Sequence, residues 1–151
     1  MSLMSIFDIS GSAMSAQTIR LNTTASNMAN ANSAAGNADD VYRARYPVFS
    51  SVQAAVAANN SDPFAMSMDG MMPASEQGVK VMGMMESEAP LQPRYEPEHP
   101  LADEDGYVFY PNVNVVEEMT NMISSSRSFQ ANVDVMDAAK TMMQRVLSLG
   151  Q

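Results

Sequence analysis

The chain has 151 residues, which is enough for one domain of ordinary size. Its 17 acidic residues outnumber its 8 Lys and Arg residues and give a net charge of -9, and such a surface repels both nucleic-acid backbones and anionic lipid headgroups. Because the chain has no Cys and a single His, it cannot build the usual zinc ligand sets by itself, and we expect no metal and no cofactor.

Residues 1–38 are predicted to form a helix that carries almost no charge, since Asp8 and Arg20 are its only charged residues. Large apolar residues recur there at intervals of seven, and the positions four residues after them or three before are small or apolar. Such a heptad seam is suited to close packing against another helix. A solvated helix usually has a charged outer face, so this one is either enclosed on most sides or weakly structured alone. The seam consists of Phe7, Met14, Leu21 and Met28, with Met4, Gly11, Thr18 and Ala25 as companions.

The same segment does not resemble a cleaved secretory signal. Its first basic residue is Arg20, and Ser and Gly interrupt the apolar runs before that residue. No stretch of the chain approaches the roughly 20 apolar residues that a membrane-spanning helix requires. We therefore expect a protein that stays in the cytoplasm or leaves it without signal cleavage, and that does not insert into the membrane.

Residues 39–112 are predicted to form a small, irregular β region. Alternating residues between Tyr42 and Val52 indicate a half-buried strand, and residues 79–85 and 107–110 are further strand candidates, the last preceded by a turn at Asp105-Gly106. Residues 57–77 are rich in Asn, Ser, Met, Asp and Gly and predict a flexible loop. The four prolines of residues 90–100 predict an extended, stiff connector.

Residues 113–151 give the strongest pattern in the chain. Asn114 is the predicted N-cap, and the helix that follows would be roughly 50 Å long, too long for a compact domain of this size. It should therefore project into something larger. One heptad series comprises Val115, Met122, Phe129, Met136 and Met143, and the predicted companion series, four residues later each time, comprises Met119, Ser126, Val133, Lys140 and Leu147.

Catalytic patterns are not found in the sequence. There is no nucleophile elbow and no phosphate-binding glycine pattern. The single His99 lies in the proline-rich connector, where an exposed loop residue is the favoured interpretation. The acidic run that begins at Asp103 lacks the twelfth-position Glu of a calcium loop, because Asn114 stands there. We predict a protein without catalysis and without a small-molecule substrate.

Residues 21–30, Leu-Asn-Thr-Thr-Ala-Ser-Asn-Met-Ala-Asn, resemble the N-terminal signature of the bacterial flagellar rod, hook and filament-type axial proteins. Tyr42-Arg43-Ala44 and residues 103–119 are similar to the basal-body rod members of that family, and residues 126–133 fit its C-terminal helix. The resemblance is strong at both ends and weak in the middle, where residues 57–77 depart from the pattern as a Met-rich insertion. Its motif positions are Asn27, Ala29 and Asn30.

The resemblance implies a mainly α fold in which residues 1–38 and 113–151 form a coiled-coil-like axial domain, with the small β region of residues 39–112 between them. It implies a structural subunit of the proximal rod of the flagellar basal body, which polymerises through its terminal helices into a tubular drive shaft and export channel. The implied partners are copies of itself, other rod proteins and the flagellar type III export apparatus, and the implied location is the periplasmic rod. The two heptad seams are the expected assembly interface.

A soluble coiled-coil adaptor or export chaperone is the alternative function. Such a protein would form a closed oligomer with a well-charged outer surface, and the nearly uncharged residues 1–38 disfavour it. A hydrolase using Asp103, Glu104 or His99 lacks a plausible site.

Overall fold

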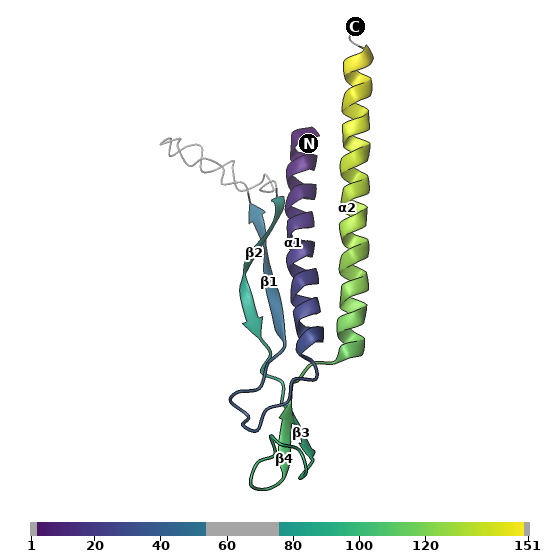
Figure 1. Cartoon of the computed structure of the whole chain (residues 1–151). Coiled ribbons are helices and arrows are strands. Elements are labelled where there is room, and N and C mark those ends of the chain that lie inside the picture. Colours follow the sequence, from purple (N-terminus) through teal and green to yellow (C-terminus); the bar gives the residue numbers. More distant parts are fainter. Residues whose placement is uncertain (1–2, 54–75, 150–151) are drawn as a thin grey trace, which may run out of the picture.

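The computed structural model describes residues 3–53 and 76–149 of the chain (Figure 1). Within these ranges the chain begins and ends with a long helix, and a small β region lies between the two helices in the sequence, as predicted. The predicted loop at residues 57–77 lies outside the described residues, except for its last two residues, which belong to a strand. The elements in chain order are α1 (Leu3–Asn30), β1 (Arg45–Gln53), β2 (Glu76–Glu86), β3 (Gln92–Tyr95), β4 (Tyr107–Tyr110) and α2 (Val115–Leu149).

Helix α1 lies between the β1–β2 hairpin on one side and the antiparallel helix α2 on the other (Figure 1). This placement explains why α1 tolerates so few charges, since two of its sides face protein rather than water. Its remaining side is exposed and consists mostly of small polar residues, among them Ser15, Asn22 and Ser26. Helix α2 is the longer of the two, and it continues past the start of α1.

The β1–β2 hairpin is held against α1 by a close backbone approach at Gly78. The strands pair antiparallel from Arg45 opposite Glu86 to Gln53 opposite Glu76. Gly78 has a φ of 129°, and a Cβ at this position would overlap the side chain of Ser12 on α1. The Ser12 hydroxyl accepts a hydrogen bond from the Val79 N–H at 3.1 Å and donates one to the Ile9 carbonyl at 2.8 Å. A side chain at Gly78 would force the hairpin off the helix.

Strands β3 and β4 form a second antiparallel pair, from Gln92 opposite Tyr110 to Tyr95 opposite Tyr107. Residues 92–95 of the proline-rich segment are extended, but the prediction of an extended connector over residues 90–100 missed their pairing with β4 and the turns at residues 97–101. A two-stranded sheet tolerates Pro93 because both of its strands are edge strands. The predicted turn is confirmed by the hydrogen bond from the Gly106 N–H to the Asp103 carbonyl at 2.8 Å and by the φ of 79° at Gly106. His99 is half-buried rather than exposed, and its Nδ1 accepts a hydrogen bond from the Leu101 N–H.

Helix α2 begins where the sequence predicts. The Asn114 Oδ1 accepts hydrogen bonds from the N–H groups of Val116 at 3.1 Å and Glu117 at 3.5 Å, so Asn114 is the N-cap. Neither α1 nor α2 has an apolar stretch of the length that crossing a membrane requires.

The buried apolar core within the described ranges is made of small side chains. It comprises Ala16, Ala31, Val41, Ala44, Val108, Val113 and Ala139. Many larger apolar residues are instead exposed, on the β1–β2 hairpin and on α2. One copy of the chain therefore leaves much of its apolar surface in contact with water, which is typical of a protein that is completed by partners.

Candidate assembly interface

The two series of large heptad residues are partly buried within the single chain. Every member of both series is half-buried: Phe7, Met14, Leu21 and Met28 on α1, and Val115, Met122, Phe129, Met136 and Met143 on α2. Their partial burial within one chain leaves surface on each of these side chains for a further contact. Whether that contact is with another subunit stays a prediction.

Most of the predicted companion residues are exposed in the single chain. On α2, Met119, Ser126, Lys140 and Leu147 are exposed and Val133 is half-buried; on α1, Thr18 and Ala25 are exposed and Gly11 is half-buried. The side chain of Met4 lies outside the described residues. The residues that follow the large ones by three positions instead of four are more buried. Ser10, Thr24, Ala31, Glu118, Ser125 and Ala139 are buried, and Gln17 and Asn132 are half-buried.

This shift of one residue has a physical reason. A heptad seam alternates steps of three and four, so a series with a spacing of seven permits a companion at either step. A count of apolar residues favours companions at the step of four, because that step includes the apolar residues Met119 and Leu147. The structure instead places small or polar residues such as Ser125 and Ala139 between the helices, where they allow the backbones to approach closely.

Polar groups also connect the helices. The Arg20 guanidinium on α1 donates a hydrogen bond to the Asn121 Oδ1 on α2 at 3.1 Å. Glu118 is 1% exposed, and within the described residues its Oε2 has no hydrogen-bond partner. Glu118 lies in the first turn of α2. Burial, and then the nearby carboxylates of Glu118 and Glu117, raise the pKa of the Tyr46 hydroxyl above its ordinary value of 10.0.

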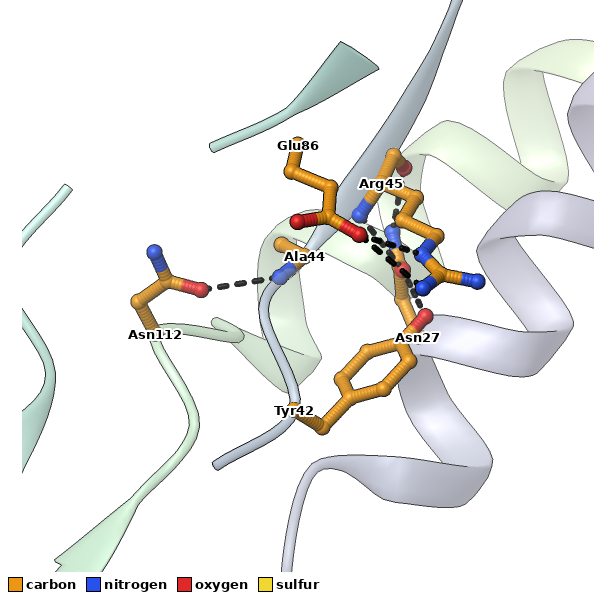
Figure 2. A network of polar contacts seen from close by, with 6 residues as sticks. All are labelled: Asn27, Tyr42, Ala44, Arg45, Glu86 and Asn112. Carbon is orange, nitrogen blue, oxygen red and sulfur yellow. Dashed lines mark hydrogen bonds and ion pairs between the residues drawn. The ribbon is translucent and has the colours of Figure 1, made fainter. Parts of the chain in front are cut away.

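A network of hydrogen bonds at the end of α1 fixes the helix to the start of β1 (Figure 2). Asn27 is fully buried, and its amide pairs with the backbone of Arg45 on both sides. Its Nδ2 donates to the Arg45 carbonyl at 2.9 Å, and its Oδ1 accepts from the Arg45 N–H at 2.9 Å and from the Tyr42 hydroxyl at 2.8 Å. The Arg45 guanidinium in turn forms an ion pair with Glu86 of β2 at 2.9 Å.

Asn112 fixes the segment that leads into α2 to the β region in a similar way (Figure 2). Its Oδ1 accepts a hydrogen bond from the Ala44 N–H at 2.9 Å, and its Nδ2 donates to the carbonyls of Ser87 and Ala89. Together Asn27 and Asn112 join the ends of both helices to the β region. We call these two residues and their partners Tyr42, Ala44, Arg45 and Glu86 the junction.

Comparison with known families gives matches at both ends of the chain. The model described as "Flagella basal body rod protein" matches residues 7–36, and the one described as "Flagellar basal body rod FlgEFG protein C-terminal" matches residues 104–149. The flagellar basal-body rod proteins FlgC of Salmonella typhimurium, Escherichia coli O6:H1 and Yersinia enterocolitica are similar to it over the whole of both chains, with identities of 46%, 48% and 47%. The chain belongs to the FlgC family.

Members of the FlgC family are structural components of the flagellar rod and are not enzymes. This chain is accordingly a structural protein of the basal-body rod, where it assembles with other rod components. The two matched ranges contain the described part of α1 from Phe7 onward, strand β4 and all of α2.

The junction explains part of the family motif within this FlgC chain. Of the three motif residues, Asn27 is buried at the centre of the junction, whereas Ala29 is exposed. Asn30 donates a hydrogen bond to the Ser26 carbonyl one turn earlier in the same helix. Sequence reasoning did not single out Asn112 or the pairing of Asn27 with Arg45. The only available signal was the position of Asn112 inside residues 103–119, the segment that resembles the rod proteins.

Proposed function

We propose that this FlgC chain is a subunit of the proximal rod that polymerises through its terminal helices into a helical tube, which serves as drive shaft and encloses the export channel. The observation that carries the proposal is the incomplete burial of the helix pair. The large seam residues of α1 and α2 are only half-buried, and apolar residues such as Val116 and Val146 on α2 are largely exposed. Neighbouring subunits would cover these surfaces.

The small fully buried core supports the same function. Since the described core consists of Ala and Val side chains, much of the hydrophobic stabilisation available to this sequence is left for contacts between chains. Repeated contacts between two different surfaces of identical or similar subunits generate an open helical assembly rather than a closed ring. The junction would then hold the β region outside the tube of helices.

The proposal includes the route to the assembly site. The chain would be exported by the flagellar type III apparatus without signal cleavage and would assemble in the periplasm beside other rod proteins. Membership of the FlgC family supports this route. A coiled-coil adaptor or export chaperone is the alternative function. Such a protein would be recovered as a closed oligomer in the soluble fraction.

Fractionation tests the proposal directly. Cells that express the chain with a small tag in place of their own copy should yield the tag in purified basal bodies. Deletion of the gene should leave basal bodies that lack a complete rod. Recovery of the tag in the soluble fraction alone, together with complete rods in the deletion strain, would support the adaptor function instead.

A further inference from the structure

The β3–β4 hairpin has one face that stays largely exposed within the described part of the chain. Residues directly opposite each other in an antiparallel pair share a face, and so do alternate residues of one strand. The pairing of Pro93 with Phe109 and of Tyr95 with Tyr107 therefore places these four residues on one face, which we call the tyrosine face. Tyr95 is 66% exposed and Tyr107 is 44% exposed, whereas Phe109 is half-buried.

The opposite face of the hairpin is occupied within the chain. Val108 is fully buried there. The Arg94 guanidinium lies over the ring of Tyr110, 4.5 Å from its centroid, and the Tyr110 hydroxyl donates a hydrogen bond to the Glu96 carboxylate at 3.2 Å. It is therefore the tyrosine face that is left for another molecule.

The two tyrosines of this face are held as a pair. Their ring centroids are 5.4 Å apart and their ring planes are inclined at 64°, which is an edge-to-face arrangement. Tyr95 packs against the backbone of Gly106, where a Cβ would lie 2.9 Å from a carbon of the Tyr95 ring. Packed tyrosine rings lose little conformational entropy on binding, and they often anchor protein interfaces. The hairpin lies at the end of the molecule far from the C-terminus, where a partner can reach it (Figure 1).

The loop that joins the two tyrosines is strongly acidic. It contains five acidic residues, and the sequence has no Lys or Arg between Arg94 and Arg127. The Asp103 N–H donates a hydrogen bond to the Tyr107 carbonyl at 2.9 Å, so the acidic loop returns directly to the tyrosine pair. The acidic residues are Glu96, Glu98, Asp103, Glu104 and Asp105, and all except Glu96 are exposed.

Cations elsewhere in the β region do not offset this charge. Arg94 belongs to the opposite face of the hairpin, where it lies over Tyr110. The segment that contacts the loop through Gly36 adds two further acidic residues, Asp39 and Asp40. Arg43 lines one pocket together with these two residues. The tyrosine face is thus an aromatic surface with a negative margin.

We infer that the tyrosine face docks on an arginine- or lysine-bearing surface of a different protein in the basal body. A cationic side chain over the ring of Tyr95 or Tyr107 is attracted by the ring quadrupole, and the flanking carboxylates form ion pairs with further cations. A second copy of this chain fits less well, because it carries a net charge of -9. The inference goes beyond the proposed function, since it concerns the β region and not the terminal helices.

Photo-crosslinking from the tyrosine face tests the inference. Tyr95→p-benzoylphenylalanine is introduced into the full chain, and purified basal bodies are irradiated. The crosslinked segment, identified by mass spectrometry, is expected to come from a different protein and to carry Arg or Lys beside the crosslinked residue. Gln92→p-benzoylphenylalanine, at an exposed position on the opposite face of the same hairpin, is the matched control and should not give this product.

Charge reversal in the loop provides a second readout. In the chain that carries the crosslinker at Tyr95, Glu104→Lys together with Asp105→Lys should lower the yield per incorporated chain by about tenfold, because like charges then face each other. Glu104→Asp together with Asp105→Glu keeps both charges and should keep the yield. Asp103 is left unchanged, because its carboxylate accepts a hydrogen bond from the Glu104 N–H at 2.8 Å.

Several results would overturn the inference. These are a crosslink to a second copy of this chain, a crosslink to a segment without Arg or Lys, attachment to a glycan, and no crosslink from chains that are present in the basal bodies. A yield that charge reversal leaves unchanged would overturn it as well. In each case the proposed function would stand, because polymerisation through the terminal helices does not require the tyrosine face.

Discussion

Replacing Asn27 by Ala should strongly reduce the incorporation of this FlgC chain into the rod when the wild-type chain is also present. Asn27 is fully buried and makes three hydrogen bonds at the junction, of 2.8 to 2.9 Å, with the Tyr42 hydroxyl and with both backbone groups of Arg45. Alanine retains the helix but offers no partner to any of these groups. The change thus separates the end of α1 from the start of β1 without altering the apolar surface.

The magnitude follows from the number of bonds. A hydrogen bond of this kind contributes about 0.5–1.5 kcal/mol net, and a buried group left without a partner costs more. Because Arg45 is exposed and Tyr42 half-buried, water can replace part of what is lost. We therefore expect a cost of about 2–4 kcal/mol for Asn27→Ala, from the per-bond values above. Tyr42→Phe, which removes one of the three bonds, should cost about 1 kcal/mol.

Competition between two tagged chains measures this cost in the assembled state. Wild type and variant are co-expressed at equal levels, and their ratio in purified basal bodies is divided by their ratio in whole cells. Each 1.4 kcal/mol corresponds to about a tenfold change, so Asn27→Ala should be depleted by about 30-fold or more. Ala29→Ser, an exposed position two residues away, is the matched control and should be incorporated like wild type.

Incorporation of Asn27→Ala within twofold of wild type would refute this reasoning. It would mean that the junction contributes nothing to the form of the subunit that enters the rod. Depletion of Asn27→Ala and Ala29→Ser to the same extent would also count against it, because the effect would then not depend on the buried amide.

The same competition tests three further changes. Phe129→Asp introduces a carboxylate at a half-buried seam position and should abolish incorporation and swimming, since an uncompensated buried charge costs several kcal/mol. The control Ala131→Asp, at an exposed position two residues away, should have little effect. Normal swimming of the Phe129→Asp strain would show that the seam is wrongly assigned. Gly106→Ala should reduce incorporation about fivefold or more, because Gly106 has a φ of 79° and the new Cβ would lie 2.9 Å from a ring carbon of Tyr95 in β3. In the control Gly83→Ala the new Cβ meets nothing within 4 Å, so incorporation should be unchanged. Deleting residues 60–74 should leave rods intact, because β1, which ends at Gln53, and β2, which begins at Glu76, already pair and hold the two sides of the deletion together. Loss of swimming at normal protein levels would show that the deleted residues make a required contact.

The helices and most strands were predictable from local patterns. The heptad spacing and the Asn114 cap predict α2, and the turn at Gly106 predicts the start of β4. These features depend on neighbours in the sequence, and a periodic pattern or a turn residue records them directly. The pairing of β3 with β4 was missed because prolines in an edge strand look the same as prolines in a connector.

Which heptad positions are buried within the single chain could not be predicted by counting apolar groups, because small and polar side chains occupy several of these positions. Small and polar residues such as Ser125 and Thr24 are buried, while Met119 and Leu147 are exposed. The junction escaped prediction for a similar reason. Asn27 and Arg45 are 18 residues apart, and nothing in the local sequence around either residue indicates that they pair.

Amide hydrogen exchange tests most directly whether neighbouring subunits complete this helix pair. The measurement compares the dilute free chain with the same chain in purified basal bodies. Because the stability of helices in proteins comes mainly from packing, and the described core is small, residues 7–28 and 115–147 should exchange rapidly in the free chain and slowly in the rod. Strong protection of both segments in a species shown to be monomeric would contradict the account.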